Sequence, residues 1–421
     1  MYKNIILVII SLFFISCSYK SHLVKPNEKA FAQEDDYIFL ALRAEQLSNH
    51  KVAAKFFEKL YEKSSKKEYL YRSLENDLVA KEYKKVIQRV DTILENTQVF
   101  DAQLIRLKIL SLLSLNHLDK AIALSVSLAI KTKKVDDYLL TSDIYVKRQD
   151  FDMAVKYLEG AYVKEYNEKI LDKMSILLYV NLGRKKDAIA ELETHSRIFG
   201  CSELICNRLI AFYSNDNNIN GMLSAYLRLY DIKKEEKIAK KIVQIYSYKR
   251  NYMELISFLE KYNSDDTLLL QIYSSLKNYK KAYILSDKLY NQTLKLDYLG
   301  QSAIFEYESA SNKENKKLLN SVVKKLTQVT QVVKKPLFMN YLGYILIDHE
   351  IDVKRGMDYI HTVLKHQPDS SFYLDSLAWG YYKLGNCHKA KNIMNRVVTL
   401  EGGDDPEVVS HVKKINQCLK N

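Results

Sequence analysis

The chain has 421 residues, more than one compact hydrophobic core usually holds, and its formal net charge is +13. It contains only 11 Gly and 4 Pro, whereas average usage would give about 29 Gly, and this scarcity of turn residues argues against a β-rich fold. Lys residues alternate with Glu and Asp along most of the chain, which is typical of solvated helices. There is no arginine-rich arm, zinc-finger spacing or RNA-binding aromatic signature, so we expect no nucleic-acid partner.

The N-terminus reads MYKNIILVIISLFFISC, with Lys3 ahead of an apolar run from Ile5 to Ile15. That run is too short for a membrane-spanning helix, which needs about 20 residues, and it has the pattern of a secretory signal peptide. Its end, Phe14-Ile15-Ser16-Cys17, resembles the bacterial lipobox, although Phe14 stands where Leu is usual. The resemblance implies a signal peptide over 1–16 and a lipidated cysteine at Cys17.

A lipidated Cys17 would become the mature N-terminus and carry acyl chains such as palmitate, and more than one chain gives stable anchoring. Ser18 follows it rather than the Asp of the inner-membrane retention signal, so the resemblance favours the outer membrane with the protein facing the periplasm. Residues 17–34 are interpreted as the lipidated cysteine and a polar tether. The alternative is an ordinary signal peptide that releases a secreted periplasmic protein.

From about residue 35 the chain repeats itself every 33 to 35 residues over most of its length. Tyr145, Tyr179, Tyr213 and Tyr246 mark one register, and a small or apolar residue nine places later marks a second. The second register extends to eleven positions: Ala53, Val86, Ala121, Ala154, Ala188, Met222, Leu255, Ala282, Leu319, Gly356 and Ala390. Three irregular steps, one of 27 residues followed by two of 37, blur the unit boundaries between 264 and 335.

This pattern resembles the tetratricopeptide repeat, a helix–turn–helix unit of 34 residues. The last unit, for example, places Leu377, Ala378, Tyr381, Gly385 and Ala390 at the family's packing positions. The resemblance implies an all-α fold, a right-handed α-solenoid of about eleven such units over 35–403. Residues 404–421 are predicted to hold a closing helix that begins at Pro406 and is capped by Asp404 or Asp405.

Four cysteines follow Cys17. Cys387 is predicted at the turn of the last unit and Cys418 near the end of the closing helix, so antiparallel stacking would bring them together. Cys201 and Cys206 are close enough in the chain to pair locally. Disulfides are plausible in an exported protein, and the alternative for each pair is two free thiols.

In tetratricopeptide proteins, positions 2, 5, 9 and 12 of each unit line a concave groove. In the last two units the resemblance places these residues there: Leu337, Asn340, Tyr344, Ile347, Phe372, Asp375, Trp379 and Tyr382. The candidate groove residues among them are Asn340, Tyr344, Phe372, Asp375, Trp379 and Tyr382. Trp and Tyr are frequent anchors of protein interfaces, but Trp379 and Tyr382 could instead pack against the closing helix. The same segment also resembles the C-terminal units of some bacterial envelope tetratricopeptide proteins, in an L-G-Y then D-S-L-x-W pattern.

No phosphate loop, dinucleotide fingerprint, nucleophile elbow or zinc-binding spacing occurs in the sequence, so we expect no enzyme, no metal and no cofactor. We predict a non-catalytic lipoprotein scaffold or adaptor that binds protein or peptide partners of the cell envelope. Its setting would be envelope assembly, secretion or cell-wall organisation. The alternative is a periplasmic ligand- or glycan-binding solenoid, and an enzyme built from distant residues ranks below both.

Overall fold

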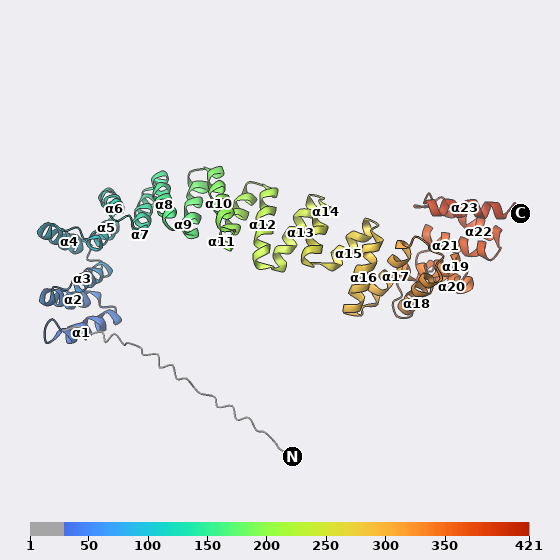
Figure 1. The fold of residues 1–421 in the computed structure, drawn as a ribbon, viewed down its shortest axis with the longest axis horizontal. Helices are drawn as coiled ribbons and strands as arrows, with labels where there is room; N and C mark the ends of the chain where they lie inside the picture. The colour runs from blue at the N-terminus through green and yellow to red at the C-terminus, as the bar shows by residue number, and fades with distance from the viewer. Residues whose placement is uncertain (1–28, 421) are drawn as a thin grey trace, which may run out of the picture. The chain divides into compact units, whose positions relative to one another are not determined.

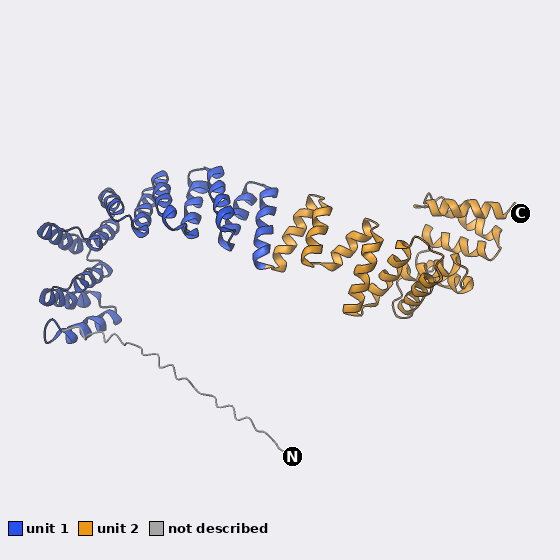
Figure 2. Ribbon diagram, in the orientation of Figure 1, with its two compact units in different colours: residues 1–233 blue, residues 234–421 orange. Residues whose placement is uncertain are grey.

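The computed structural model describes residues 29–420, and every regular element in that range is a helix (Figure 1). The predicted signal peptide, Cys17 and most of the predicted tether lie outside the described residues. The chain divides into two compact units, residues 1–233 and 234–421 (Figure 2), a division that the repeat pattern did not predict. None of the described helices is long and apolar enough to cross a bilayer.

The first unit holds six antiparallel helix pairs. Their helices are α1 (Glu34–Gln46), α2 (His50–Ser64), α3 (Lys67–Val79), α4 (Tyr83–Thr97), α5 (Ala102–Ser114), α6 (Leu118–Thr132), α7 (Val135–Arg148), α8 (Phe151–Glu165), α9 (Glu168–Ile176) with its π-helical extension η1 (Leu177–Asn181), α10 (Lys185–Phe199), α11 (Glu203–Asn215) and α12 (Ile219–Lys233).

The second unit holds five pairs and a closing helix. Its helices are α13 (Glu236–Tyr248), α14 (Tyr252–Tyr262), α15 (Asp266–Ser275), α16 (Tyr279–Thr293), α17 (Leu296–Ser309), α18 (Lys316–Val332), α19 (Pro336–Asp348), α20 (Val353–Leu364), α21 (Ser371–Lys383), α22 (Cys387–Val397) and α23 (Pro406–Cys418). Asp405 caps α23 by accepting a hydrogen bond from the backbone N–H of Glu407, and Pro406 occupies the first turn, as predicted.

The eleven predicted register positions coincide with one structural position. Each of them is the fourth residue of the second helix of its pair. Ten are buried and Met222 is half-buried, because this position faces the first helix of the same pair. The prediction of an all-α array of eleven tetratricopeptide-like helix pairs with a closing helix is therefore confirmed.

The pair α19–α20 shows why the register prefers small residues. A methyl group added to Gly356 would lie 2.7 Å from the carbonyl oxygen of Gly343, and one added to Gly343 would lie 2.9 Å from that of Gly356. Two helix backbones can approach this closely only where neither carries a side chain at the crossing. Alanine at the same position elsewhere allows a slightly wider approach.

The turn inside each pair is built by backbone geometry as much as by sequence. In nine of the eleven pairs a residue with positive φ stands two places before the second helix, and only Gly183 and Gly385 among these are glycine. In pair α19–α20 that residue, Glu350, stands one place earlier because the turn contains an extra residue, which contributes to the register step of 37 residues that ends at Gly356. Side chains of Asn49, Asp150 and Asn386 cap the helix that follows the turn.

Charged side chains form ion pairs between neighbouring helix pairs. Arg106 on α5 binds the buried carboxylate of Asp137 on α7 with Nε–Oδ1 at 2.6 Å, and Arg208 on α11 binds Asp172 on α9 at the same distance. The partners are about one repeat apart in sequence, so each ion pair links consecutive first helices. The alternation of Lys and Arg with Asp and Glu therefore contributes to stacking as well as to solubility.

Glu34 at the start of α1 is the most strongly perturbed carboxyl of the first pair. Lys66 donates to its Oε1 at 2.7 Å, Tyr69 donates to the same atom at 2.7 Å, and the backbone N–H of Ala30 donates to Oε2. The hydrogen bond from Lys66 is the largest cause that lowers the pKa of this buried carboxyl to about 2.

Candidate functional site

Trp379, the only tryptophan of the chain, lies beneath the closing helix. It is 2% exposed, and its ring stacks on His411 of α23 with the centroids 3.9 Å apart. Tyr382 stacks on the indole at 4.6 Å, and the indole N–H donates to Oδ1 of Asp348 at 2.8 Å. Of the two alternatives for Trp379, the structure shows packing against the closing helix.

The polar groove candidates Asp375 and Tyr344 also bind α23. Nδ1 of His411 donates to the carboxylate of Asp375, 3.0 Å from each oxygen, and the hydroxyl of Tyr344 donates to Glu407. Burial and the nearby Glu407 raise the pKa of the Tyr344 hydroxyl. The expectation of an open groove is corrected at Asp375 and Trp379, because α23 lies across the predicted groove-facing positions of α19 and α21.

Two of the predicted groove residues differ from this buried set. Phe372 is largely exposed at the start of α21. Asn340 is half-buried on α19, and its side-chain oxygen is buried without a hydrogen-bond partner in the structure. The structure therefore brings Tyr344, Asp375, Trp379 and Tyr382 together around α23 and leaves Phe372 outside that cluster.

The closing helix is held at its far end by a cysteine pair. The structure joins Cys387, the first residue of α22, to Cys418, the last residue of α23, with a Cα–Cα distance of 6.0 Å. It also joins Cys201, in the turn after α10, to Cys206 on α11, with 5.5 Å between the Cα atoms. Both distances lie within the usual range for disulfides.

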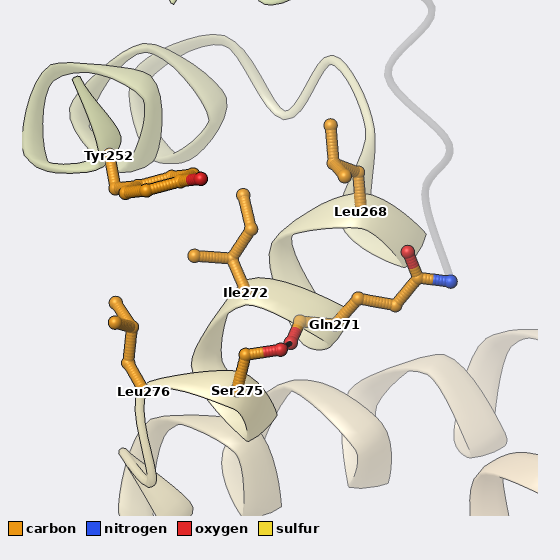
Figure 3. A pocket seen from close by; sticks show the side chains of 6 residues that line it. All are labelled: Tyr252, Leu268, Gln271, Ile272, Ser275 and Leu276. Carbon is orange, nitrogen blue, oxygen red and sulfur yellow. Dashed lines mark hydrogen bonds between the residues drawn. The ribbon is translucent and has the colours of Figure 1, made fainter. Parts of the chain in front are cut away.

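An open apolar groove lies elsewhere in the second unit, between α14 and α15 (Figure 3). It encloses about 420 Å³ and is lined by Tyr252, Leu268, Gln271, Ile272, Ser275 and Leu276. In Figure 3, Ile272 lies to the right of Tyr252 and Leu276, and its side chain points toward Tyr252. The side chains of Tyr252 and Leu276 are about half exposed, so a ligand in the groove would bury apolar surface beside the Gln271 amide and the Ser275 hydroxyl.

Sequence reasoning did not identify this groove, although the sequence carries a signal of it. The register step from Leu255 to Ala282 is 27 residues, the shortest in the array. The structure explains the short step, because α14 and α15 have 11 and 10 residues where α2 and α1 have 15 and 13. The groove lies between these two shortened helices.

The described residues contain no evident catalytic or metal centre. Across residues 29–420, no three or more His, Cys, Asp or Glu side chains gather in a way that could hold a metal ion. The polar side chains around Trp379 are engaged with one another and with α23. The side chains of these surfaces are apolar groups, a few amides and hydroxyls, and ion pairs, which are suited to binding rather than to catalysis.

No family model and no curated protein matches the chain. Solved structures resemble it in fold. One is the "Structure of Naa15/Naa10 bound to HypK-THB", at a TM-score of 0.35 and 13% identity over 82% of this chain, which spans 65% of that protein's length. Another is the "APC/C hetero-tetramer Cut9-Hcn1", at 0.35 and 10% identity over 92% of this chain and 97% of that one.

A tetratricopeptide repeat protein from Parabacteroides merdae gives a TM-score of 0.28 and 12% identity over 67% of this chain and 98% of its own. At TM-scores this low, none of these likenesses carries a partner or a function over to this chain. The fold assignment therefore depends on the eleven helix pairs and their common register position.

Proposed function

We propose that the protein is a non-catalytic scaffold that binds other proteins, and that the groove between α14 and α15 receives apolar side chains of a partner. The observation that carries this proposal is an open, largely apolar groove with two hydrogen-bonding side chains in its lining. Protein-binding sites combine buried apolar anchors with a few hydrogen-bonding groups at their edge. Gln271 and Ser275 supply such groups beside Leu268, Ile272 and Leu276.

The location of the scaffold is a further part of the proposal. The lipobox-like end of the N-terminal apolar run supports a lipid anchor at Cys17, with the helical array facing the periplasm from the outer membrane. The partners would then be proteins of the cell envelope. The alternative of a secreted periplasmic protein differs from this only in the fate of Cys17.

The groove is tested by site-specific photocrosslinking in intact cells. A photoreactive residue at Leu276, which is 51% exposed in the groove, is expected to capture a discrete protein. The same residue at Leu294, which is exposed in the turn after α16 and does not line the groove, is the matched control. A lysine at Leu276 should weaken partner binding by more than fivefold, about 1 kcal/mol, without lowering thermal stability.

Equal capture at Leu276 and Leu294, or partner binding that survives Leu276→Lys unchanged, would refute the groove as the binding site. Capture of a saccharide or small ligand in place of a protein would favour the ligand-binding alternative. The anchor is tested separately by Cys17→Ala. This variant should lose palmitate labelling and leave the membrane fraction, and a variant that keeps both contradicts the lipid anchor.

A further inference from the structure

The outer face of α1 is apolar and uncovered. Phe39, Leu40 and Leu47 are 68%, 43% and 64% exposed, whereas Ala41 and Ala44 on the inner face of the same helix are buried. No described residue packs over these three side chains to bury them. Their spacing places them along one stripe of the helix.

The other end of the array is finished differently. There α23 buries Val408, His411 and Ile415 and turns mainly polar side chains outward, including Lys413 and Gln417. Helical repeats normally need such a polar outer face at each end, because a packing face left open exposes the core side of a repeat. α1 therefore retains the surface of an internal repeat, which a partner would be expected to cover.

Charge on the same stripe indicates what kind of partner fits. Asp36 and Arg43 are both exposed, and they flank Phe39 and Leu40 along the length of the helix. They are seven residues apart, about 10 Å along the helix axis, which is too far for them to pair with each other. The guanidinium of Arg43 contacts only the neighbouring Gln46 side chain, at 3.3 Å.

A second α1 in antiparallel orientation matches this arrangement. If the two-fold axis passes between Phe39 and Leu40, each Phe39 meets the Leu40 of the other copy, and each Arg43 meets the other copy's Asp36. One surface is then complementary to itself, as an isologous interface requires. The apolar centre and both charge pairs are satisfied at once by the same chain.

We infer that the outer face of α1 binds a second copy of this chain, α1 against α1, about a two-fold axis between Phe39 and Leu40. One helix per chain offers less area than the roughly 800 Å² per partner of a standard interface. The dimer is therefore weak, and it forms where the chain is concentrated. It joins two chains through their first helices, and the residues of the α14–α15 groove are not part of this interface.

The face is tested on the full chain in cells with a photoreactive residue at Leu47. The expected product is a crosslinked species of twice the chain mass. Leu40→Lys should abolish it, while Leu42→Lys should not. Leu42 is the matched control because it is also 43% exposed and lies two residues away on a different side of α1.

The charge pairing is tested by exchange. Asp36→Arg alone and Arg43→Asp alone each place two like-charged contacts in a self-dimer, and each should lower the crosslink about five- to thirtyfold. Co-expression of the two variants with different tags should restore the crosslink in mixed pairs only, because each arginine then meets an aspartate. A circular dichroism melt of each variant checks that the fold is retained.

Several outcomes would overturn the inference. These are no self-crosslink in the unsubstituted chain, equal loss with Leu40→Lys and Leu42→Lys, or no recovery in the mixed pair. Capture of a different protein, of lipid, or of residues 1–28 of the same chain by the Leu47 probe would also overturn it. None of these results bears on the α14–α15 groove, so the two proposals fail independently.

Discussion

Replacing His411 by alanine is expected to loosen the closing helix, and the structure supplies the magnitude. The substitution removes the ring that stacks on Trp379 at 3.9 Å and leaves the carboxylate of Asp375 without its donor. Asp375 is buried, and leaving a buried polar group without its hydrogen-bond partner costs about 1–3 kcal/mol, and more where that group is charged. Loss of the ring contact adds about 0.5–1.5 kcal/mol.

The double variant Asp375→Ala/His411→Ala separates the two contributions. It removes the charge together with its partner, so no buried carboxylate is left unpaired. We expect it to be about 2 kcal/mol more stable than His411→Ala alone. A simple loss of packing would instead make the double variant less stable than the single one.

Urea unfolding followed by tryptophan fluorescence is the assay, because Trp379 is the only tryptophan and lies directly under α23. The signal reports the C-terminal pair rather than the whole array, whose repeats need not unfold together. All variants are compared with the cysteines in the same oxidation state. If the single and double variants unfold at the same urea concentration, the argument from an unpaired Asp375 is refuted.

Three further predictions concern other parts of the chain. Gly356→Ala should destabilise the second unit by about 1–3 kcal/mol in a denaturant titration, because the added methyl group would lie 2.7 Å from the Gly343 carbonyl oxygen. The cost of this clash outweighs the better helix propensity of alanine. A neutral or stabilising effect would contradict the close approach of the two helices as the reason for glycine. Reducing the Cys387–Cys418 pair, which closes a separation of 31 residues, should lower the stability of α23 by up to about 3–4 kcal/mol, and thiol titration before reduction should detect neither cysteine. The pKa of Glu34 is about 2 in the fold against 4.5 for an ordinary glutamate. Its stabilising effect, on the order of 1–2 kcal/mol after screening, is therefore complete above about pH 5 and lost as the pH falls towards 2. Glu34→Gln should flatten this part of a curve of stability against pH, and an unchanged fall in stability at low pH would contradict a stabilising role for the Glu34 hydrogen bonds.

The repeat could be predicted because it depends on local spacing. A small or apolar residue recurring at steps near 34 identified the fourth residue of every second helix, including Gly356, where the turn carries an extra residue. The longer register steps of 37 residues and the short step of 27 were also visible in the sequence. The groove between α14 and α15 could not be predicted, because its shape depends on how two shortened helices pack in space.

The groove residues show the same limit. The family resemblance implied that Trp379 and Asp375 line the groove, but it could not say whether α23 would cover them. That depends on long-range contacts such as Trp379 with His411 and Asp375 with His411, which join residues more than 30 positions apart. The exposed stripe on α1 was equally invisible, because exposure depends on what lies next to a helix.

The sequence by itself determined the helical class, the register and length of the array, and the closing helix with its Asp405 cap and Pro406 start, because periodicity and capping act over a few residues. Tertiary structure alone decided which surfaces stay open. In the structure α23 covers Asp375 and Trp379, a groove lies where α14 and α15 are short, and the outer face of α1 is uncovered. Burial is a property of packed neighbours, and the neighbours of a given side chain are set by the fold rather than by the residues beside it in the chain.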